Sequence, residues 1–269
     1  MEKIKQAVEK ARQQQAAQRG SETPKGANDS DSIADGIKYS KTRVVAPDAA
    51  ALRRNRVILG SDDSQAAAAY NMLRTQVEQR LSANNWNSLA ITSSSAEQGK
   101  TLTAVNLSLA LAREMHRTVL LVDLDLRNPS VHKTLNLPVT HGLVDYLNSD
   151  IPVGDILINP GIERLVILPA GQPVANSSEL VSSPNMVRLV EELKSRYPSR
   201  IIIFDLPPLL SVDDALAFSP YVDTTILVIE DGATTREELT RAVEILDDVH
   251  LLGTVLNKSL ESVPAYARV

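Results

Sequence analysis

The sequence predicts an α/β fold, a doubly wound and mostly parallel sheet with helices on both faces. Short apolar runs, such as Ile-Ile-Ile-Phe at 201–204, are typical of strands that are covered on both faces. Segments with helical spacing of apolar residues lie between these runs, so strands and helices alternate along the chain. Polar and acidic residues follow several of the runs directly. Ligands of such sheets bind at this carboxyl edge of the strands, and we expect the functional site there.

The elements follow from periodicity and from the turn residues between them. Runs rich in Val, Ile and Leu and bounded by polar or turn residues predict strands at 88–92, 118–123, 165–168, 200–205, 224–229 and 253–256. Apolar residues spaced three to four apart predict helices at 64–81, 101–115, 184–196 and 235–249. The main domain is therefore expected at 64–258, with a short tail at 259–269.

The first part of the chain has a different composition. Ile4, Val8 and Ala11 recur at helical spacing among Lys, Glu and Gln, which predicts a polar helix at 1–19. This helix is either solvated or docked on a partner or a sister subunit. Residues 20–63 contain much Ser, Asp and Gly and few large apolar residues, and we expect a largely disordered linker there.

Bulk composition excludes several classes of function. The chain has 269 residues and a net charge of −5, which gives no basic footprint for nucleic acid. It contains no cysteine, so disulfides, thiolate metal sites and cysteine nucleophiles are excluded. No apolar run approaches the roughly 20 residues of a membrane span, and no signal-peptide core is present. We expect a cytoplasmic protein without a direct membrane span, whose membrane role would come through a partner.

A loop of small residues follows the first predicted strand and leads through Gly99-Lys100-Thr101 into a helix. Backbone N–H groups of such a loop cradle phosphates, Lys100 would reach the β and γ oxygens, and the Thr101 hydroxyl would bind Mg²⁺. The pattern G-x-x-x-x-G-K-[ST] has Ser94 in place of its first glycine, so the match is partial. The residues expected to bind the nucleotide here are Ser95, Ala96, Glu97, Gln98, Gly99, Lys100, Thr101 and Leu102.

Two further strands end in acidic residues. Asp123 ends the strand at 118–123, Asp125 follows two residues later, and Asp205 ends the strand at 200–205. Mg²⁺ prefers one or two carboxylates together with phosphate oxygens and water, so Asp123 and Asp205 are candidate metal residues with Thr101. One of Asp123 and Asp125 would direct a metal-bound water, and the other would accept a proton from an attacking hydroxyl. The candidate catalytic residues are therefore Lys100, Asp123, Asp125 and Asp205.

Other polar residues near the strand ends allow two interpretations. Arg127 stabilises phosphate charge or forms a surface ion pair. Asn257, after the last strand, reads the adenine edge or serves a turn. Asp213 and Asp214 are expected to cap a helix that begins at Ala215. The four histidines show no metal spacing, and G-x-S-x-G is absent from the sequence.

Residues from about 64 to 258 resemble the bacterial tyrosine autokinases of capsule and exopolysaccharide synthesis. The matching segments are 96–101 (Walker A), 121–129 (Walker A′) and 203–208 (Walker B), with the connecting segments 142–147 and 168–171. Residues 4–11 are similar to members encoded with exosortase-type loci. The resemblance implies binding of ATP and Mg²⁺ and transfer of phosphate to tyrosines of a sister subunit. It also implies a membrane co-polymerase (chain-length determinant) partner that recruits the protein to the inner face of the membrane.

The same resemblance implies roles for single residues. Lys100 and Thr101 would bind phosphate and Mg²⁺, and Asp205 would hold the metal through water. Asp123 and Asp125 would serve metal binding or deprotonation of the tyrosine.

The sequence departs from this family in two places. Members usually end in a tyrosine cluster, whereas the tail after Lys258 contains only Tyr266, the candidate phosphoacceptor. The Glu-x-x-Arg-x-x-Arg pattern used for ring assembly corresponds to Ala68, Asn71 and Arg74 here, so only its last arginine remains. Two alternatives therefore stay open: a non-catalytic nucleotide-binding scaffold of the same machinery, or a switch ATPase of the partitioning or division-site type. The second class normally carries a further lysine where this chain has Ser95.

Overall fold

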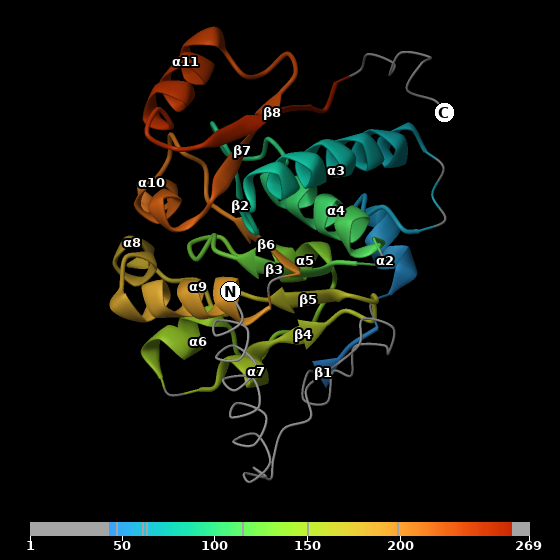
Figure 1. Cartoon of the computed structure of the whole chain (residues 1–269), viewed down its shortest axis with the longest axis vertical. Coiled ribbons are helices and arrows are strands. Elements are labelled where there is room, and N and C mark those ends of the chain that lie inside the picture. Colours follow the sequence, from blue (N-terminus) through green and yellow to red (C-terminus); the bar gives the residue numbers. More distant parts are fainter. Residues whose placement is uncertain are drawn as a thin grey trace, which may run out of the picture. The chain divides into compact units, whose positions relative to one another are not determined.

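Eight described strands form one sheet in the order β1-β4-β5-β3-β6-β2-β7-β8 (Figure 1). The computed structural model describes residues 43–46, 48–60, 62, 64–114, 116–149, 151–197 and 199–259. The predicted helix at 1–19, residues 20–42 of the predicted linker and Tyr266 lie outside them. All the described residues belong to a single compact unit.

The sheet is mostly parallel, as predicted. The strands are β1 (Arg43–Val44), β2 (Ser88–Ser93), β3 (Thr118–Asp123), β4 (Ile158–Asn159), β5 (Leu165–Leu168), β6 (Arg200–Asp205), β7 (Thr224–Glu230) and β8 (Leu251–Asn257). Neighbouring strands pair in parallel except β4 with β5, which pair antiparallel. The α/β fold with a mostly parallel sheet is therefore confirmed.

Helices cover both faces of the sheet. Alternate residues of the central strands point to opposite sides and are apolar, so each face has to be buried. On one face, Leu120 and Val122 of β3 join a core with α6 (Leu143–Asn148), α8 (Ser177–Val181), α9 (Pro184–Arg196) and α10 (Asp214–Phe218). On the other face, Val119 and Leu121 pack with α3 (Gln65–Asn84) and α4 (Lys100–Ala112). Figure 1 shows α3 and α4 lying together. The remaining helices are α2 (Ala49–Arg54), α5 (Val131–Thr134), α7 (Val153–Ile156), α11 (Arg236–Ile245) and a 3₁₀ turn at Ser219–Tyr221.

Residues 43–58 require a correction. The sequence places them in a largely disordered linker, but they contribute β1, α2 and buried Leu52, Val57 and Ile58 to the fold. The side chain of Asn106 on α4 accepts a hydrogen bond from Ile58 N and donates one to Arg56 O. The apolar residues of this segment are too few and too scattered to predict a helix or strand by their periodicity. The segment is held by Asn106, which is distant in the sequence.

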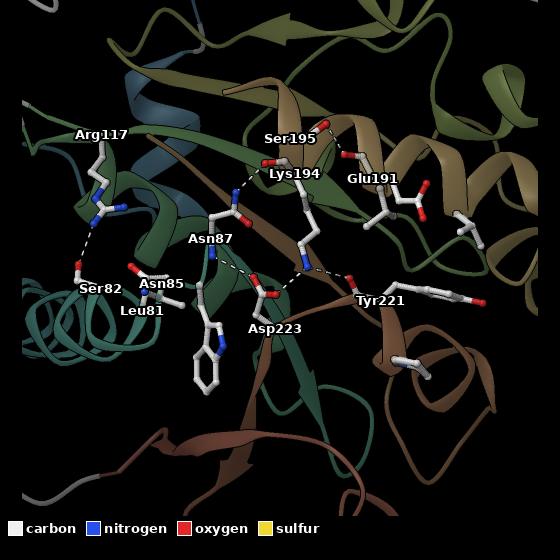
Figure 2. Close-up of a pocket in the computed structure, with 14 residues that line it drawn as sticks. Leu81, Ser82, Asn85, Asn87, Arg117, Glu191, Lys194, Ser195, Tyr221 and Asp223 are labelled. Atoms are coloured by element: carbon white, nitrogen blue, oxygen red, sulfur yellow. Dashed lines mark hydrogen bonds and ion pairs between the residues drawn. The ribbon is translucent and has the colours of Figure 1, made fainter. Parts of the chain in front are cut away.

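A cavity of about 860 Å³ opens at the amino end of the central strands, between the end of α3 and the side of α9 (Figure 2). Two of its charged groups, Lys194 and Asp223, pair with each other: Asp223 accepts hydrogen bonds from Lys194 Nζ at 2.7 Å and from the backbone of Asn87 and Ser88 at 2.9 Å. Burial opposes the charge of Asp223, but these hydrogen bonds outweigh it and lower its pKa. This cluster joins the starts of β2 and β7. Among the described residues, no helix has the length and apolarity that a bilayer span requires.

Candidate active site

The predicted site residues meet at the carboxyl edge of three adjacent strands. β6 lies between β3 and β2, and Asp123 is the register partner of Asp205. The loop at 94–99 follows β2 and leads into α4. Parallel pairing therefore brings both strand-terminal acids beside the start of α4, as the sequence predicts.

The loop before α4 has the backbone shape of an anion cradle. Glu97 and Gly99 adopt left-handed conformations, with φ of 63° and 92°. Within the part of the chain that the structure describes, no side chain caps the start of α4. The first N–H groups of a helix lack partners inside the helix, and the helix dipole adds positive potential there. The start of α4 is therefore suited to phosphate.

Ser94, the departure from the glycine pattern, is accommodated without strain. Its φ is not among the positive values found in the described chain, so this position does not need glycine. Its side chain is fully buried, and its hydroxyl donates to Gln98 Oε1 at 2.9 Å. The buried serine therefore stabilises the conformation of the loop through this hydrogen bond.

We expect that Ser94→Gly weakens nucleotide binding, although it restores the glycine pattern. The change removes the hydrogen bond to Gln98 and adds backbone freedom, and each effect is worth about 0.5–1.5 kcal/mol. Calorimetric titration with an ATP analogue should show a several-fold higher Kd and thermal unfolding a lower midpoint. Ser82→Gly, on the exposed part of α3, controls for the general effect of a serine-to-glycine exchange. Tighter binding by Ser94→Gly would show that the serine is a defect after all.

Lys100 is held by two carboxylates. Its Nζ lies 2.7 Å from Asp125 Oδ2 and 3.7 Å from Asp205 Oδ1, and the side chain is buried. Burial lowers the pKa of Lys100, but the charges of Asp205 and Asp125 outweigh this and raise the pKa above its ordinary value. Lys100 is therefore positively charged and held in place at the first residue of α4, directly after the loop.

Asp123 and Asp205 are fully buried, and in each of them one oxygen accepts hydrogen bonds. Asp123 Oδ2 accepts from the backbone N–H groups of Ser130 and Val131 at 3.0 Å, and Asp205 Oδ2 accepts from Thr101 Oγ1 at 2.7 Å. Their Oδ1 atoms have no hydrogen-bond partner among the described residues. Burial raises the pKa of Asp123 to about 8, with the charge of Asp205 acting in the same direction. Burial also raises the pKa of Asp205, against the opposing charge of Lys100.

These oxygens fit a magnesium ion. Two buried carboxylates on neighbouring strands each present one oxygen without a hydrogen bond, and the Thr101 hydroxyl donates to the other oxygen of Asp205. Mg²⁺ takes hard oxygen ligands and commonly only one or two carboxylates, the rest being phosphate oxygens and water. A cation would also favour the charged forms of the two acids, against the burial that raises their pKa values.

The structure places Arg127 and the acids after β6 in one cluster beside this site. Arg127 Nη2 lies 3.6 Å from Asp214 Oδ1 and 3.5 Å from Ser178 Oγ, which favours the ion-pair interpretation of Arg127. Asp213 and Asp214 do not cap a helix at Ala215 as expected. The helix begins at Asp214, and both carboxylates contact Ser178 Oγ, at 2.6 and 2.5 Å. Both side chains form hydrogen bonds with Ser178 on α8 instead of with the start of the helix, and the local sequence gives no sign of this contact.

Asn257 and several residues that the sequence analysis missed support the loop. Asn257 Nδ2 donates to Gln98 O at 2.8 Å, so this residue contacts the loop rather than serving only a turn. Thr234 accepts from Gln98 Nε2 at 2.9 Å, and Glu238 accepts from Ser95 Oγ at 3.0 Å. The pattern Thr-Arg-Glu-Glu at 235–238 is a readable capping box, but nothing in it indicates contact with a loop more than a hundred residues away.

The last arginine of the assembly pattern is also accounted for. Arg74 Nη1 lies 3.0 Å from Glu114 Oε1 of the same chain. The contact ties α3 to the end of α4. The structure therefore gives Arg74 a role inside its own subunit.

The fold and the site together define the class of protein. A parallel sheet, a phosphate loop after β2 and acids at the ends of β3 and β6 are the arrangement of the P-loop NTPases. A model of the AAA domain family matches residues 87–261.

Similar proteins narrow this class. The chain is 33% identical over 208 residues to the tyrosine-protein kinase YwqD of Bacillus subtilis, covering 77% of this chain and 86% of that protein. The kinase domain of the Escherichia coli tyrosine kinase ETK matches with a TM-score of 0.70 at 25% identity, over 83% of this chain and 91% of that one. The septum site-determining protein MinD of Pyrococcus horikoshii, solved with Mg-ADP, matches with a TM-score of 0.55 at 26% identity, over 68% and 75%. The chain belongs to the bacterial tyrosine autokinase family of capsule and exopolysaccharide synthesis.

Proposed function

We propose that this protein is an ATP-dependent protein-tyrosine autokinase that regulates capsule or exopolysaccharide polymerisation and export. The observation that carries the proposal is the cluster of Lys100, Asp125, Asp123 and Asp205 beside the start of α4. A general nucleotide-binding domain needs the loop and one metal-side acid. The additional buried pair of Lys100 with Asp125 provides a group that can accept a proton beside the transferred phosphate.

Nucleotide binding would use the residues from Ser95 to Leu102. The backbone N–H groups after Ser95, whose own N–H donates to Gln98 Oε1, would hold the phosphates, with Lys100 as the compensating cation. Thr101, Asp123 and Asp205 would hold Mg²⁺, which when bound neutralises negative charge on the phosphates. Arg127 would contribute positive charge near the phosphates, and its pairing with Asp214 would fix its position.

The contact between Lys100 and Asp125 links phosphate binding to proton transfer. When Lys100 turns to the phosphates, it leaves Asp125 Oδ2 free to accept a hydrogen bond from the acceptor tyrosine. Asp125 then takes the phenolic proton while the phenolic oxygen bonds to the γ-phosphorus. The bond from that phosphorus to the β,γ-bridging oxygen breaks, and ADP leaves. Asp123, fixed by the N–H groups of Ser130 and Val131, stays on the metal side.

The acceptor and the partners complete the proposal. Tyr266, in the tail after β8, is the proposed acceptor, and a sister subunit would present it. A membrane co-polymerase would stimulate the kinase at the inner face of the membrane, with the segment at 1–19 available for docking. The domain at 64–258 would carry the chemistry. Relatives named as tyrosine-protein kinases support this assignment.

The test is phosphate transfer by the full chain with γ-labelled Mg·ATP and the cytoplasmic segment of its membrane partner. We expect label on tyrosine, located by mass spectrometry, and a loss of most of it in Tyr266→Phe. Tyr197→Phe, at an exposed tyrosine of the main domain, should label as the wild type does. ATP hydrolysis without phosphotyrosine would favour the switch ATPase, and nucleotide binding without either reaction would favour the scaffold.

A further inference from the structure

Asn257 lies directly against the peptide that joins Gln98 to Gly99. Its Nδ2 donates to Gln98 O at 2.8 Å. A Cβ atom added to Gly99 would overlap that same Nδ2. Because Gly99 has a φ of 92°, a conformation that side chains rarely adopt, this position is restricted to glycine by both backbone and neighbour.

The contact sets the direction of one N–H group in the phosphate loop. In a trans peptide the C=O and the following N–H point in opposite directions. With Gln98 C=O held toward Asn257, the N–H of Gly99 points away from Asn257. Gly99 is the residue before α4, where N–H groups without partners bind anions. Glycine permits the alternative orientation of this peptide, so the orientation depends on what holds the carbonyl.

A second set of contacts holds Gln98 from its side chain. Gln98 is 4% exposed, and its Oε1 accepts from Ser94 Oγ and Ser95 N while its Nε2 donates to Thr234 Oγ1. Thr234 Oγ1 also accepts from Glu230 N at 2.8 Å. In the same turn, Asp231 N donates to Asn257 O at 2.9 Å. The turn between β7 and α11 therefore supports both Gln98 and Asn257.

We propose that Asn257 is a positioning residue that acts through the carbonyl of Gln98 and directs the Gly99 N–H at the phosphates of the nucleotide. Thr234 is the second support of the same peptide. This contact would affect the binding of the polyphosphate part of the ligand and would not distinguish between bases. The inference rests on the proposed binding of ATP, but it does not depend on phosphate transfer to tyrosine. This positioning role would take the place of adenine recognition as the role of Asn257.

The test compares three ligands on the full chain. Mg·ATP, Mg·GTP and magnesium tripolyphosphate are titrated by calorimetry into the wild type, Asn257→Asp and Thr234→Val. Asn257→Asp keeps the shape but replaces the donor with an oxygen that repels Gln98 O. We expect Kd to rise about tenfold for all three ligands, with the ATP-to-GTP ratio unchanged. Thr234→Val should raise all three Kd values about threefold. Asn148→Asp, at an exposed position at the end of α6, should leave them unchanged.

The outcomes separate this inference from the proposed function. Weaker binding of ATP with unchanged binding of tripolyphosphate would show that Asn257 reads the base, and would overturn the inference. Unchanged affinity for all ligands would also overturn it and leave the kinase proposal standing. A wild type that binds none of the ligands would end both. Melting temperatures of the ligand-free variants are measured in parallel, because positioning predicts the loss of affinity without a matching loss of stability. If Asn257→Asp does not fold, Thr234→Val decides the question, since it places no charge beside the loop.

Discussion

Lys100→Met is expected to lower tyrosine phosphorylation by about a thousandfold or more. Removal of one preorganised donor at a developing charge costs about 10²–10³ in rate, and Lys100 also supplies a full positive charge. Methionine has nearly the same length but cannot bind phosphate. The measurement is phosphotyrosine formed per chain under Mg·ATP, with the partner segment present. Activity above about a tenth of the wild-type value would rule out Lys100 as the phosphate cation.

The same substitution should change stability in a pH-dependent way. Lys100 is the cation beside Asp125 and Asp205, and its loss leaves buried carboxylates without compensation. Such a loss costs about 3–5 kcal/mol while the carboxylates stay charged, and protonation of Asp205, whose pKa burial raises, reduces the cost. Urea unfolding should therefore show a larger deficit at pH 8 than at pH 6. Lys133→Met, at an exposed position on α5, should behave as the wild type in both assays.

The central features of the site could be predicted from the sequence because they are local. Gly99-Lys100-Thr101 follows a strand, and Asp123 and Asp205 end strands, so the order of elements places them at one edge. The pairing of β3 with β6 then brings the two acids into register. Each of these inferences needs only a motif and the rule that parallel strands end on the same side.

The supports of the site could not be predicted in this way. Ser94 counts as a departure from the motif until its negative φ and its bond to Gln98 are known. Thr234 and Asn257 contact the loop across well over a hundred residues of chain, and Thr in a turn or Asn at a strand end has many ordinary uses. Short helices such as α5, α8 and α10 have too few turns for apolar periodicity, and the segment after α2 is held by the distant Asn106.

Asp123→Asn is expected to lower phosphorylation at least about a hundredfold while stabilising the metal-free protein at high pH. The pKa of Asp123 is about 8 in the folded chain, because of burial and the charge of Asp205, against an ordinary value of 3.8. At pH values between these two pKa values, Asp123 is protonated in the folded state and ionised in the unfolded state. The stability of the wild type should therefore fall as pH rises from about 4 to 8, by up to about 1.4 kcal/mol per pH unit from this group. Asparagine is neutral throughout and removes this dependence, so its advantage grows with pH.

Urea unfolding in EDTA at pH 5, 6, 7 and 8 measures this effect, with Asp248→Asn as an exposed control that should follow the wild type. Asparagine still offers an oxygen to the N–H groups of Ser130 and Val131, so the loop after β3 should keep its shape. Mg·ATP should raise the melting temperature of the wild type much more than that of the variant, and phosphorylation should drop at least about a hundredfold. A wild type whose stability does not fall toward pH 8, or a variant that keeps its activity, would contradict the role of Asp123. A gain in stability together with a loss of activity would mean that the buried acid is retained for catalysis and metal binding, at the expense of the metal-free fold.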